Sequence, residues 1–574
     1  MKKPKRQTPA RAASAGGRVL KYYALGGVLA LFAVLEVYQP ALNGPFLFDD
    51  QYLPFQLPEL MNAPLRVWLT FNRPFLMASF WLNLRMFGLQ PYFYHLFNVL
   101  FHLANALLVY AIVRKILQWA KAEAWPREAG AVLAGAIFLL HPLQTESVAY
   151  VASRSEALSV LFCYAAFALF LYRRREAISF STSAGVVLLF GAGCLTKEHV
   201  AVLPVLLLLT DYYWNPGFSF QGIRRNWRLY AILAVVGAGG LVFVWRVLGG
   251  SDTAGFGIKD LPWYQYLYTQ GRAIWVYLRM FVLPVGQNID WDFPISRSPL
   301  QFGALFGLAG CAALMVAAWI WRRRFPLASY GMLTFFLLIA PTSSFIPIKD
   351  PLVERRMYLP MLGLLLVVAE LIRRWKVRRP VLINWAAAGV FLLAMVAWNR
   401  NRVWSSPVAL WEDAAAKSPG KTRPWFQLAY ANFELGRCDR AMQQYEKVAQ
   451  LAPADYSLLV DWALACDCAG QRELAVAKLR QAAGIENRAH VYALMGMIYG
   501  KQGKRTEALE ALSQAERINP GFEKIYVYRG KLYGDSGEFA AAAEQYRRAL
   551  SLDANDEQAS KGLALAERHL AVAY

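Results

Sequence analysis

The stretch QFGALFGLAGCAALMVAAWIWRRR at residues 301–324 decides the fold class. Its first 21 residues contain no Asp, Glu, Lys or Arg, and about 20 apolar residues are enough for a helix to cross the hydrocarbon core of a bilayer. The run ends in three consecutive arginines, which is typical of the cytoplasmic end of a membrane span. We therefore predict a transmembrane helix here, with its C-terminal end on the cytoplasmic side.

Similar apolar segments recur along the first two thirds of the chain, and together they predict about eleven spans. They cover residues 20–38, 93–113, 129–145, 156–172, 181–196, 199–214, 229–248, 301–321, 327–346, 356–372 and 381–398. A content of 57% hydrophobic and only 17% charged residues agrees with a polytopic membrane protein.

The net charge of +22 raises the question of nucleic-acid binding, but the basic residues stand in short bursts between the apolar runs. If the N-terminal tail 1–19 is cytoplasmic, every burst falls on the cytoplasmic side. The bursts are Arg114, Lys115, Lys121 and Arg127, then Arg173–Arg175, then Arg224, Arg225 and Arg228, then Arg322–Arg324, and finally Arg373, Arg374, Lys376, Arg378 and Arg379. We therefore predict no nucleic-acid partner. The segment 249–300 should lie outside with an interfacial or re-entrant helix, and an odd number of spans places everything after Asn399 outside.

A repeat with a period of 33 to 34 residues follows the membrane part. Ala441, Ala475, Ala508 and Ala542 are spaced by 34, 33 and 34 residues, as in the small positions where paired helices touch in tetratricopeptide repeats. We predict a transmembrane domain at 20–400 and a repeat domain at 401–574, with about four repeats over 422–556 and a capping helix over 557–574.

The cysteines of the chain suggest a disulfide and no metal site. The spacing of the six cysteines matches no zinc motif. Cys438 and Cys468 fall in neighbouring repeats, so a disulfide between them is compatible with an oxidising compartment.

Ionisable residues at the predicted outer ends of the spans are the candidate site, because such groups are costly beside a membrane. Asp49 and Asp50 lie in the first outer loop, where one carboxylate could act as a general base towards an incoming hydroxyl; a helix cap or a solvated turn is the alternative. The candidates for binding an anionic, lipid-linked phosphate are Arg73, His102, His141, Glu146, Arg154, Lys197, Glu198, Glu354, Arg355, Arg356 and Tyr358. Each taken alone reads more simply as an interfacial anchor or an ion pair.

Several of these residues stand in runs that resemble one family. The runs are FLFDD (46–50), NRPF (72–75), YHLFNVLFH (94–102), HPLQTE (141–146), TKE (196–198), VERRMYLP (353–360) and NRNRVW (399–404). In this order they resemble the transmembrane and tetratricopeptide-repeat (TMTC) proteins of the GT-C class of glycosyltransferases.

The resemblance implies an all-α GT-C bundle and an inverting transfer of a mannose-like sugar. The donor would be a polyprenyl phosphate, and the acceptor Ser or Thr of exported proteins on the non-cytoplasmic face. Asp49 would be the general base, supported by Asp50, and Arg355 and Arg356 would bind the lipid phosphate. No metal or cofactor is required, although a divalent cation could bridge the two aspartates.

Alternatives to this function stay open at this stage. One is transfer to a cell-envelope glycan or lipid, and another is a membrane scaffold whose repeats recruit partners. The predicted location is a bacterial inner membrane with the repeats in the periplasm, or else the endoplasmic reticulum with the repeats luminal. The candidate residues for holding a polypeptide acceptor on the repeats are Trp425, Tyr430, Asn432, Trp462, Tyr499 and Tyr533.

Overall fold

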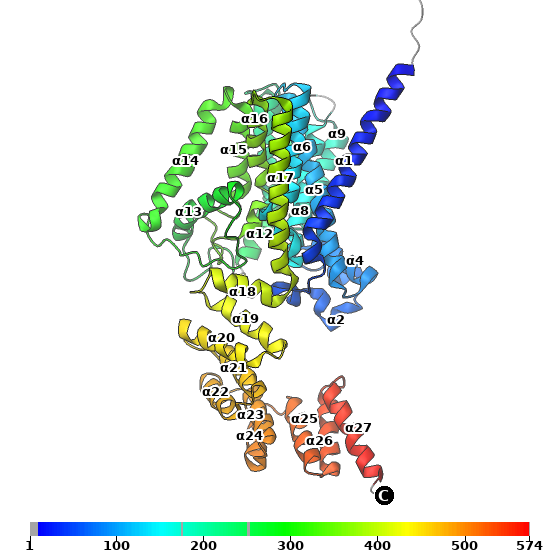
Figure 1. Ribbon diagram of the computed structural model, residues 1–574, viewed down its shortest axis with the longest axis vertical. Helices are drawn as coiled ribbons and strands as arrows, with labels where there is room; N and C mark the ends of the chain where they lie inside the picture. Colours follow the sequence, from blue (N-terminus) through cyan, green and yellow to red (C-terminus); the bar gives the residue numbers. More distant parts are fainter. Residues whose placement is uncertain (1–9, 174–175, 250–252, 573–574) are drawn as a thin grey trace, which may run out of the picture. The chain divides into compact units, whose positions relative to one another are not determined.

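The computed structural model describes residues 10–173, 176–249 and 253–572, and it is all-helical in these ranges apart from one isolated antiparallel bridge between Ala254 and Ile348. The chain forms two compact units, residues 1–410 and 411–574. The predicted all-α fold with apolar spans and helical repeats is confirmed (Figure 1).

Five helices of the first unit are long and apolar enough to cross a membrane, or six if one bent pair counts as a span. They belong to α1 (Ala10–Leu42), α5 (Pro91–Trp119), α8 (Arg154–Leu171), α14 (Ala304–Ile320) and α17 (Arg379–Arg402), and the bent pair joins α6 (Ala124–Leu140) to the segment Pro142–Ala149. Shorter apolar helices are α9 (Phe180–Cys194), α15 (Pro326–Ile339) and the first part of α12 (Trp227–Gly249). The remaining predicted spans fall on α10 (Leu203–Trp214) and α16 (Met361–Arg374), so the number eleven stays a prediction.

Burial separates the inner helices from those that face lipid. In α8, 78% of the apolar window is buried, against 17% in α14 and 11% in α17. The short helix α16 packs closely on α15, where Gly331 and Gly363 leave no room for a side chain between the two backbones. Small residues at such contacts let membrane helices approach each other, so α8 and α16 form the centre of the bundle.

The segment between α12 and α14 contains α13 (Trp263–Val282), which is not among the candidate spans. Its Tyr266, Ala273 and Tyr277 are fully buried, whereas Trp263 and Val282 are exposed. A helix with one buried and one exposed apolar face agrees with the interfacial helix expected here.

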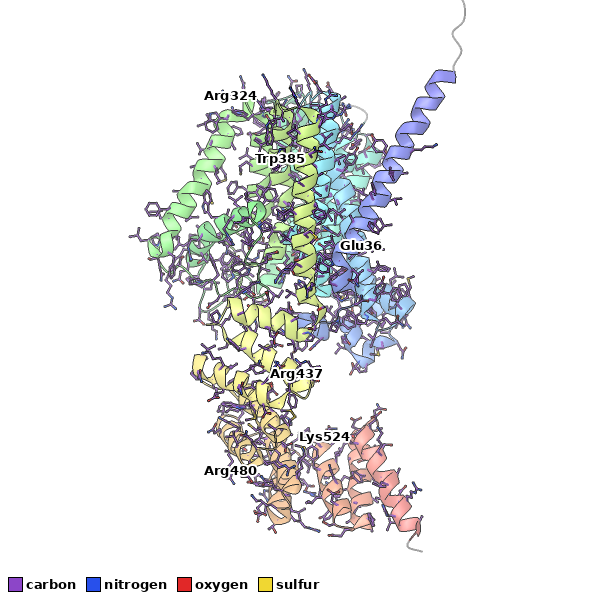
Figure 2. All side chains as sticks on the ribbon, viewed as in Figure 1. Glu36, Arg324, Trp385, Arg437, Arg480 and Lys524 are labelled. Carbon is purple, nitrogen blue, oxygen red and sulfur yellow. A yellow bond between two sulfur atoms is a disulfide. The ribbon has the colours of Figure 1, made fainter. Side chains whose placement is uncertain are left out.

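The basic bursts gather at one end of the bundle. Arg373 donates to the backbone oxygen of Ala120 at 3.4 Å. Arg374 donates to the backbone oxygen of Arg324. Figure 2 labels Arg324 at this end of the bundle. Lys115 lies 5.2 Å from the ring centre of Tyr172, next to Arg173. These contacts join the ends of α5, α8, α15 and α16, as the positive-inside pattern predicts. Arg174 and Arg175 lie outside the described residues, as do residues 1–9 of the predicted tail.

In its described residues the second unit contains most of α18 (Pro407–Lys417), four helical hairpins and a last helix. The hairpins are α19 (Thr422–Glu434) with α20 (Cys438–Leu451), α21 (Tyr456–Cys468) with α22 (Arg472–Ile485), α23 (Ala489–Lys501) with α24 (Arg505–Ile518), and α25 (Lys524–Asp535) with α26 (Phe539–Leu552), followed by α27 (Glu557–Val572). All four alanines of the repeat pattern are fully buried. A disulfide joins Cys438 to Cys468, with their Cα atoms 5.8 Å apart. The last two residues of the predicted cap, 573–574, lie outside the described part.

Candidate active site

The two adjacent aspartates of the loop after α1 have opposite environments. Asp49 is exposed, whereas Asp50 is fully buried. The carboxylate of Asp50 accepts the backbone N–H of Ala152 at 2.6 Å and that of Leu47 at 3.1 Å. Burial raises the pKa of Asp50 to about 7, against the opposing effect of these N–H donors. Asp50 therefore fixes the loop to the segment before α8, and Asp49 is the carboxylate that a substrate can reach.

Tyr150 supports the loop beside Asp49. Its phenol oxygen accepts the backbone N–H of Asp49 at 3.1 Å. Its buried ring stacks on that of Trp404 at 5.8 Å between centroids, and the guanidinium of Arg355 lies 6.0 Å from the centre of the same ring. Tyr150 thus contacts both the exposed aspartate and the cation of Arg355.

Three cations of the same end of the bundle are each held by a carboxylate. Arg355 pairs with Glu146 at 2.6 Å and donates its backbone N–H to the same group at 3.1 Å. Lys197 pairs with Glu156. Arg73 binds Glu198 through two bonds of 3.1 and 2.9 Å.

In each of these pairs the cation is more exposed than its partner. The side chains of Arg355, Lys197 and Arg73 are 28%, 18% and 37% exposed, and those of their carboxylate partners 3%, 6% and 25%. The carboxylates therefore orient the cations, and each cation keeps part of its side chain accessible. Such an array suits a phosphate, because charge-assisted hydrogen bonds to arginine and lysine are strong and directional.

The three cations also share one electric field. Burial lowers the pKa of Lys197, and the charges of Arg73 and Arg355 lower it further, while Glu156 opposes them. The charges of Arg73 and Arg355 therefore both act on Lys197. That these three residues together bind a donor phosphate stays a prediction.

Other predicted site residues lie inside the bundle with their polar atoms engaged. Arg154 is fully buried and donates to the side-chain oxygen of Asn98 and to the backbone oxygen of Tyr94, both at 2.9 Å. His102 bonds to the hydroxyl of Tyr358 at 2.8 Å and to the oxygen of Leu139 at 3.0 Å. These contacts join α5 to α6, α8 and the turn before α16, so they stabilise the helix packing.

Three further candidates brace the loops around the site. His141 bonds to the backbone oxygen of Phe281 at 3.0 Å. Arg356 donates to the oxygens of Pro351 and Asp350 at 2.9 and 2.6 Å and is almost fully buried. Glu354 accepts from the amide of Gln287 at 2.7 Å and from the backbone of Asn288, and burial raises its pKa to about 7. Of the two neighbouring arginines, Arg355 is the one that faces outward.

Sequence reasoning missed Tyr150, Trp404 and the loop that holds Glu354. Trp404 closes the run NRNRVW, and the loop reads QNIDWD at 287–292. Polar and aromatic residues concentrated in an outer loop were the available signal. Within the described residues no group of three or more His, Cys, Asp and Glu side chains is arranged as a metal site.

The acceptor candidates on the repeat unit differ in exposure. Tyr430 is 40% exposed, and Trp425 and Tyr533 are partly exposed. Asn432 is fully buried and bonds to Gln444 at 3.0 Å. The ring of Trp462 lies under the amine of Lys478 at 3.4 Å, and the hydroxyl of Tyr499 accepts from Arg480 at 2.9 Å. Among these candidates, the rings with the larger exposure belong to the first and fourth repeats.

Comparison with known proteins extends over both units. The tetratricopeptide repeat family model matches residues 422–455, 489–522 and 523–556. The chain is 23% identical over 547 residues to a mouse protein named "Protein O-mannosyl-transferase TMTC3", and 21% identical over 550 residues to the human protein of the same name; each match covers 86% of this chain and 58% of the relative. The chain is TMTC-like. A Caenorhabditis elegans relative, "Protein O-mannosyl-transferase F38B6.6", is 22% identical over 67% of this chain and 54% of its own length.

The TMTC resemblance inferred from the outer-loop motifs is thus confirmed. This TMTC-like chain spans just over half the length of the curated relatives that it matches. The second hairpin, α21 with α22, falls between the matched repeats, although it folds like its neighbours.

Proposed function

We propose that this protein is a membrane glycosyltransferase that moves a mannose-like sugar from a polyprenyl phosphate to Ser or Thr of exported proteins. The proposal depends on one arrangement: an exposed carboxylate, Asp49, connected through Tyr150 to Arg355, with Lys197 and Arg73 nearby. The names of the relatives, which are protein O-mannosyl-transferases, support the class of reaction.

The chemistry assigned to these residues is a single displacement. The hydroxyl oxygen of the acceptor attacks the anomeric carbon of the sugar, and its proton passes to the carboxylate of Asp49. The bond between the anomeric carbon and the phosphate oxygen breaks, and the electron pair stays on the lipid phosphate. The N–H groups of Arg355, Lys197 and Arg73 that their carboxylate partners leave free stabilise the charge that develops there. Attack opposite the leaving group inverts the anomeric centre.

The site would lie on the non-cytoplasmic face. The basic bursts gather at the other end of the bundle, which the positive-inside rule assigns to the cytoplasm. The repeat unit follows the end of α17 that carries Arg400 and Trp404, and its disulfide fits an oxidising compartment. The periplasm of a bacterium is the compartment that we propose.

The repeats would present the polypeptide acceptor. Tetratricopeptide arrays form extended surfaces for chain segments, and Tyr430, Trp425 and Tyr533 offer exposed rings for such contacts. The acceptor would then be captured on the same side of the membrane as Asp49.

The deciding experiment measures sugar transfer by the Asp49→Asn variant in membranes supplied with a polyprenyl-phosphate sugar. Loss of a positioned general base lowers the rate by about 10²- to 10⁴-fold. The matched control is Asp260→Asn, since Asp260 is also an exposed aspartate of an outer loop. Wild-type transfer by Asp49→Asn would exclude Asp49 as the base. Exported proteins that lack the transferred sugar in mass spectrometry would favour a glycan or lipid acceptor.

A further inference from the structure

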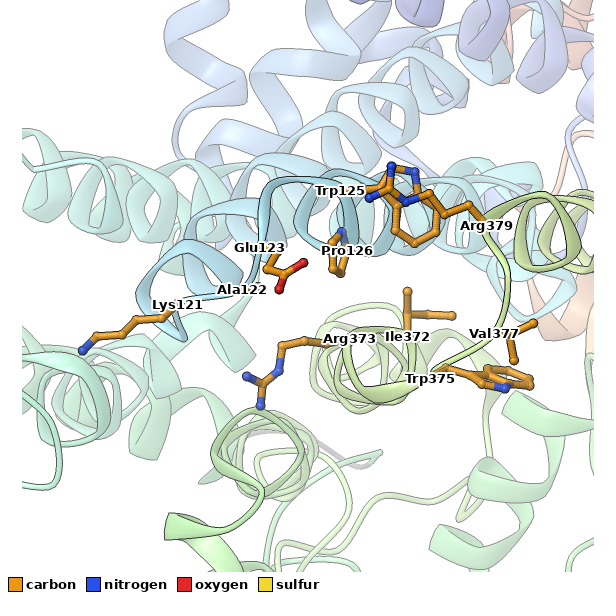
Figure 3. A pocket seen from close by; sticks show the side chains of 10 residues that line it. All are labelled: Lys121, Ala122, Glu123, Trp125, Pro126, Ile372, Arg373, Trp375, Val377 and Arg379. Atoms are coloured by element: carbon orange, nitrogen blue, oxygen red, sulfur yellow. The ribbon is translucent and has the colours of Figure 1, made fainter.

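A cavity of about 390 Å³ opens at the basic end of the bundle, away from Asp49. It lies between the turn from α5 to α6 and the turn from α16 to α17 (Figure 3). Its lining includes Lys121, Glu123, Trp125, Arg373, Trp375 and Arg379. No step of the proposed transfer uses these residues.

Two of the cations that line the cavity, Arg379 and Lys121, have no acidic partner in the part of the chain that the structure describes. Arg379 lies over the ring of Trp125, 5.2 Å from its centroid, and Figure 3 shows the two side chains together. Within residues 10–173, 176–249 and 253–572, the side chains of Arg379 and Lys121 form no hydrogen bond or ion pair. Arg373, by contrast, is held by Glu370 at 2.9 Å. Arg379 and Lys121 are therefore available to an anion.

The backbone at Lys121 is unusual for a lysine. Its φ is +55°, in the left-handed region that glycine adopts most easily. The turn is held by the bond from the backbone N–H of Ala122 to the oxygen of Leu117 at 3.0 Å. A glycine would fit this helix end without strain, so the lysine brings a charged amine to a place where local structure alone favours glycine.

Two tryptophans place the cavity at the level of lipid headgroups. Trp375 is 57% exposed and Trp125 partly exposed, and both stand at ends of apolar helices. Tryptophan is enriched where a membrane meets water. An occupant of this cavity would therefore meet the headgroup layer and not the hydrocarbon core.

We propose that this cavity binds the headgroup of an anionic phospholipid of the cytoplasmic leaflet, with Arg379 and Lys121 on the phosphate. Basic pockets between membrane helices recognise such headgroups. Glu123, whose carboxylate faces the same cavity, disfavours a doubly charged phosphate and accepts hydrogen bonds from hydroxyls. The favoured ligand is a singly charged phosphodiester that carries free hydroxyl groups, such as phosphatidylglycerol.

The test measures lipid-dependent thermal stabilisation of the purified full chain in detergent. Phosphatidylglycerol is added in one arm, phosphatidylcholine in a second and inorganic phosphate in a third. We expect stabilisation by phosphatidylglycerol alone. Equal stabilisation by phosphatidylcholine, or equal stabilisation by inorganic phosphate, would overturn the proposal.

Two variants and one control connect the effect to the cavity. Arg379→Gln and Lys121→Gly should each weaken apparent phosphatidylglycerol affinity about fivefold, since each removes one cation near the headgroup. Lys121→Gly should unfold at the same or a higher temperature without lipid, because it relieves the backbone, so a weaker affinity is not a folding defect. Arg323→Gln removes an exposed cation that does not line the cavity and should bind like wild type. Wild-type affinity in both cavity variants contradicts the proposal.

Discussion

The two ends of the membrane unit treat their charges differently. At the end with Asp49, Glu146 holds Arg355 and Glu198 holds Arg73, one arginine to each carboxylate. At the basic end each of two carboxylates serves two arginines: Glu370 contacts Arg373 and Arg374, and Glu128 contacts Arg114 and Arg127. The cations at the first end are paired individually. Those at the second outnumber the carboxylates that hold them, and only the buried pair of Arg173 with Asp211, at 2.6 Å, is one-to-one among the pairs named there.

The difference in charge pairing fits the functions that we propose for the two ends. A buried carboxylate without its partner is expensive, so a single pair fixes an arginine in one place. An excess of cations fixes no geometry, but it is the pattern that the positive-inside rule expects at a cytoplasmic end. Precise placement at one end and surplus charge at the other agree with a reaction site and an orientation signal.

Arg355→Ala should have the largest effect, because it leaves the buried carboxylate of Glu146 without its bonded cation. We expect a loss of about 3–5 kcal/mol in the free energy of unfolding and at least about a hundredfold loss of transfer. Arg373→Ala is the matched variant of the other end. Since Arg374 still contacts Glu370, it should cost less than about 1 kcal/mol and leave transfer unchanged. Thermal unfolding and transfer assays measure both, and equal losses in the two variants would remove the distinction between the ends.

The disulfide between Cys438 and Cys468 allows two tests, one of the stability of the repeat unit and one of the compartment that this unit faces. Cys438 and Cys468 are separated by 30 residues, and cross-linking a loop of this length contributes about 3–4 kcal/mol. The double variant Cys438→Ser with Cys468→Ser should lower the stability of the repeat unit by that amount. Cys466 is a buried free cysteine of α21, the helix that ends at Cys468. The variant Cys466→Ser is therefore the control. Thiol labelling of the wild type isolated from cells, with and without reductant, measures the bond. Labelling of Cys438 and Cys468 without reductant would place the repeats on a reducing side of the membrane and contradict the proposed compartment.

Asp50→Asn probes the hydrogen bonds that place Asp49. An asparagine keeps one acceptor oxygen but turns an N–H group towards the other backbone donor, at a cost of about 1–3 kcal/mol. Because the pKa of Asp50 rises from 3.8 unfolded to about 7 folded, folding takes up a proton between these values, and the stability of the wild type falls as pH rises from about 4 to about 7. The variant lacks this dependence, so the stability difference between wild type and variant should be larger at pH 5 than at pH 8. A difference that is constant over this range contradicts the proton uptake at Asp50.

The sequence predicts the architecture well and individual side-chain directions poorly. Apolar length revealed the membrane helices, and the spacing from Ala441 to Ala542 revealed the repeats, because both signals are local and periodic. The choice between Asp49 and Asp50, or between Arg355 and Arg356, is set by distant contacts. Asp50 is buried because Ala152, far along the chain, donates to it, and such long-range contacts leave no periodic trace in the sequence.

Arg73→Lys should have the smallest effect and the most specific one. The Arg73–Glu198 pair is partly exposed on both sides, so its loss should change stability by less than about 1 kcal/mol. A lysine keeps the charge but cannot form the two parallel bonds to Glu198, and therefore it is not fixed in one direction. If Arg73 binds the phosphate of the donor, the KM for the lipid-linked sugar should rise about tenfold, the effect of losing one charge-assisted bond, while kcat and the acceptor KM stay close to wild type. A change in kcat alone would instead indicate that Arg73 acts on the loop of Asp49, and the donor would then depend on Arg355 and Lys197.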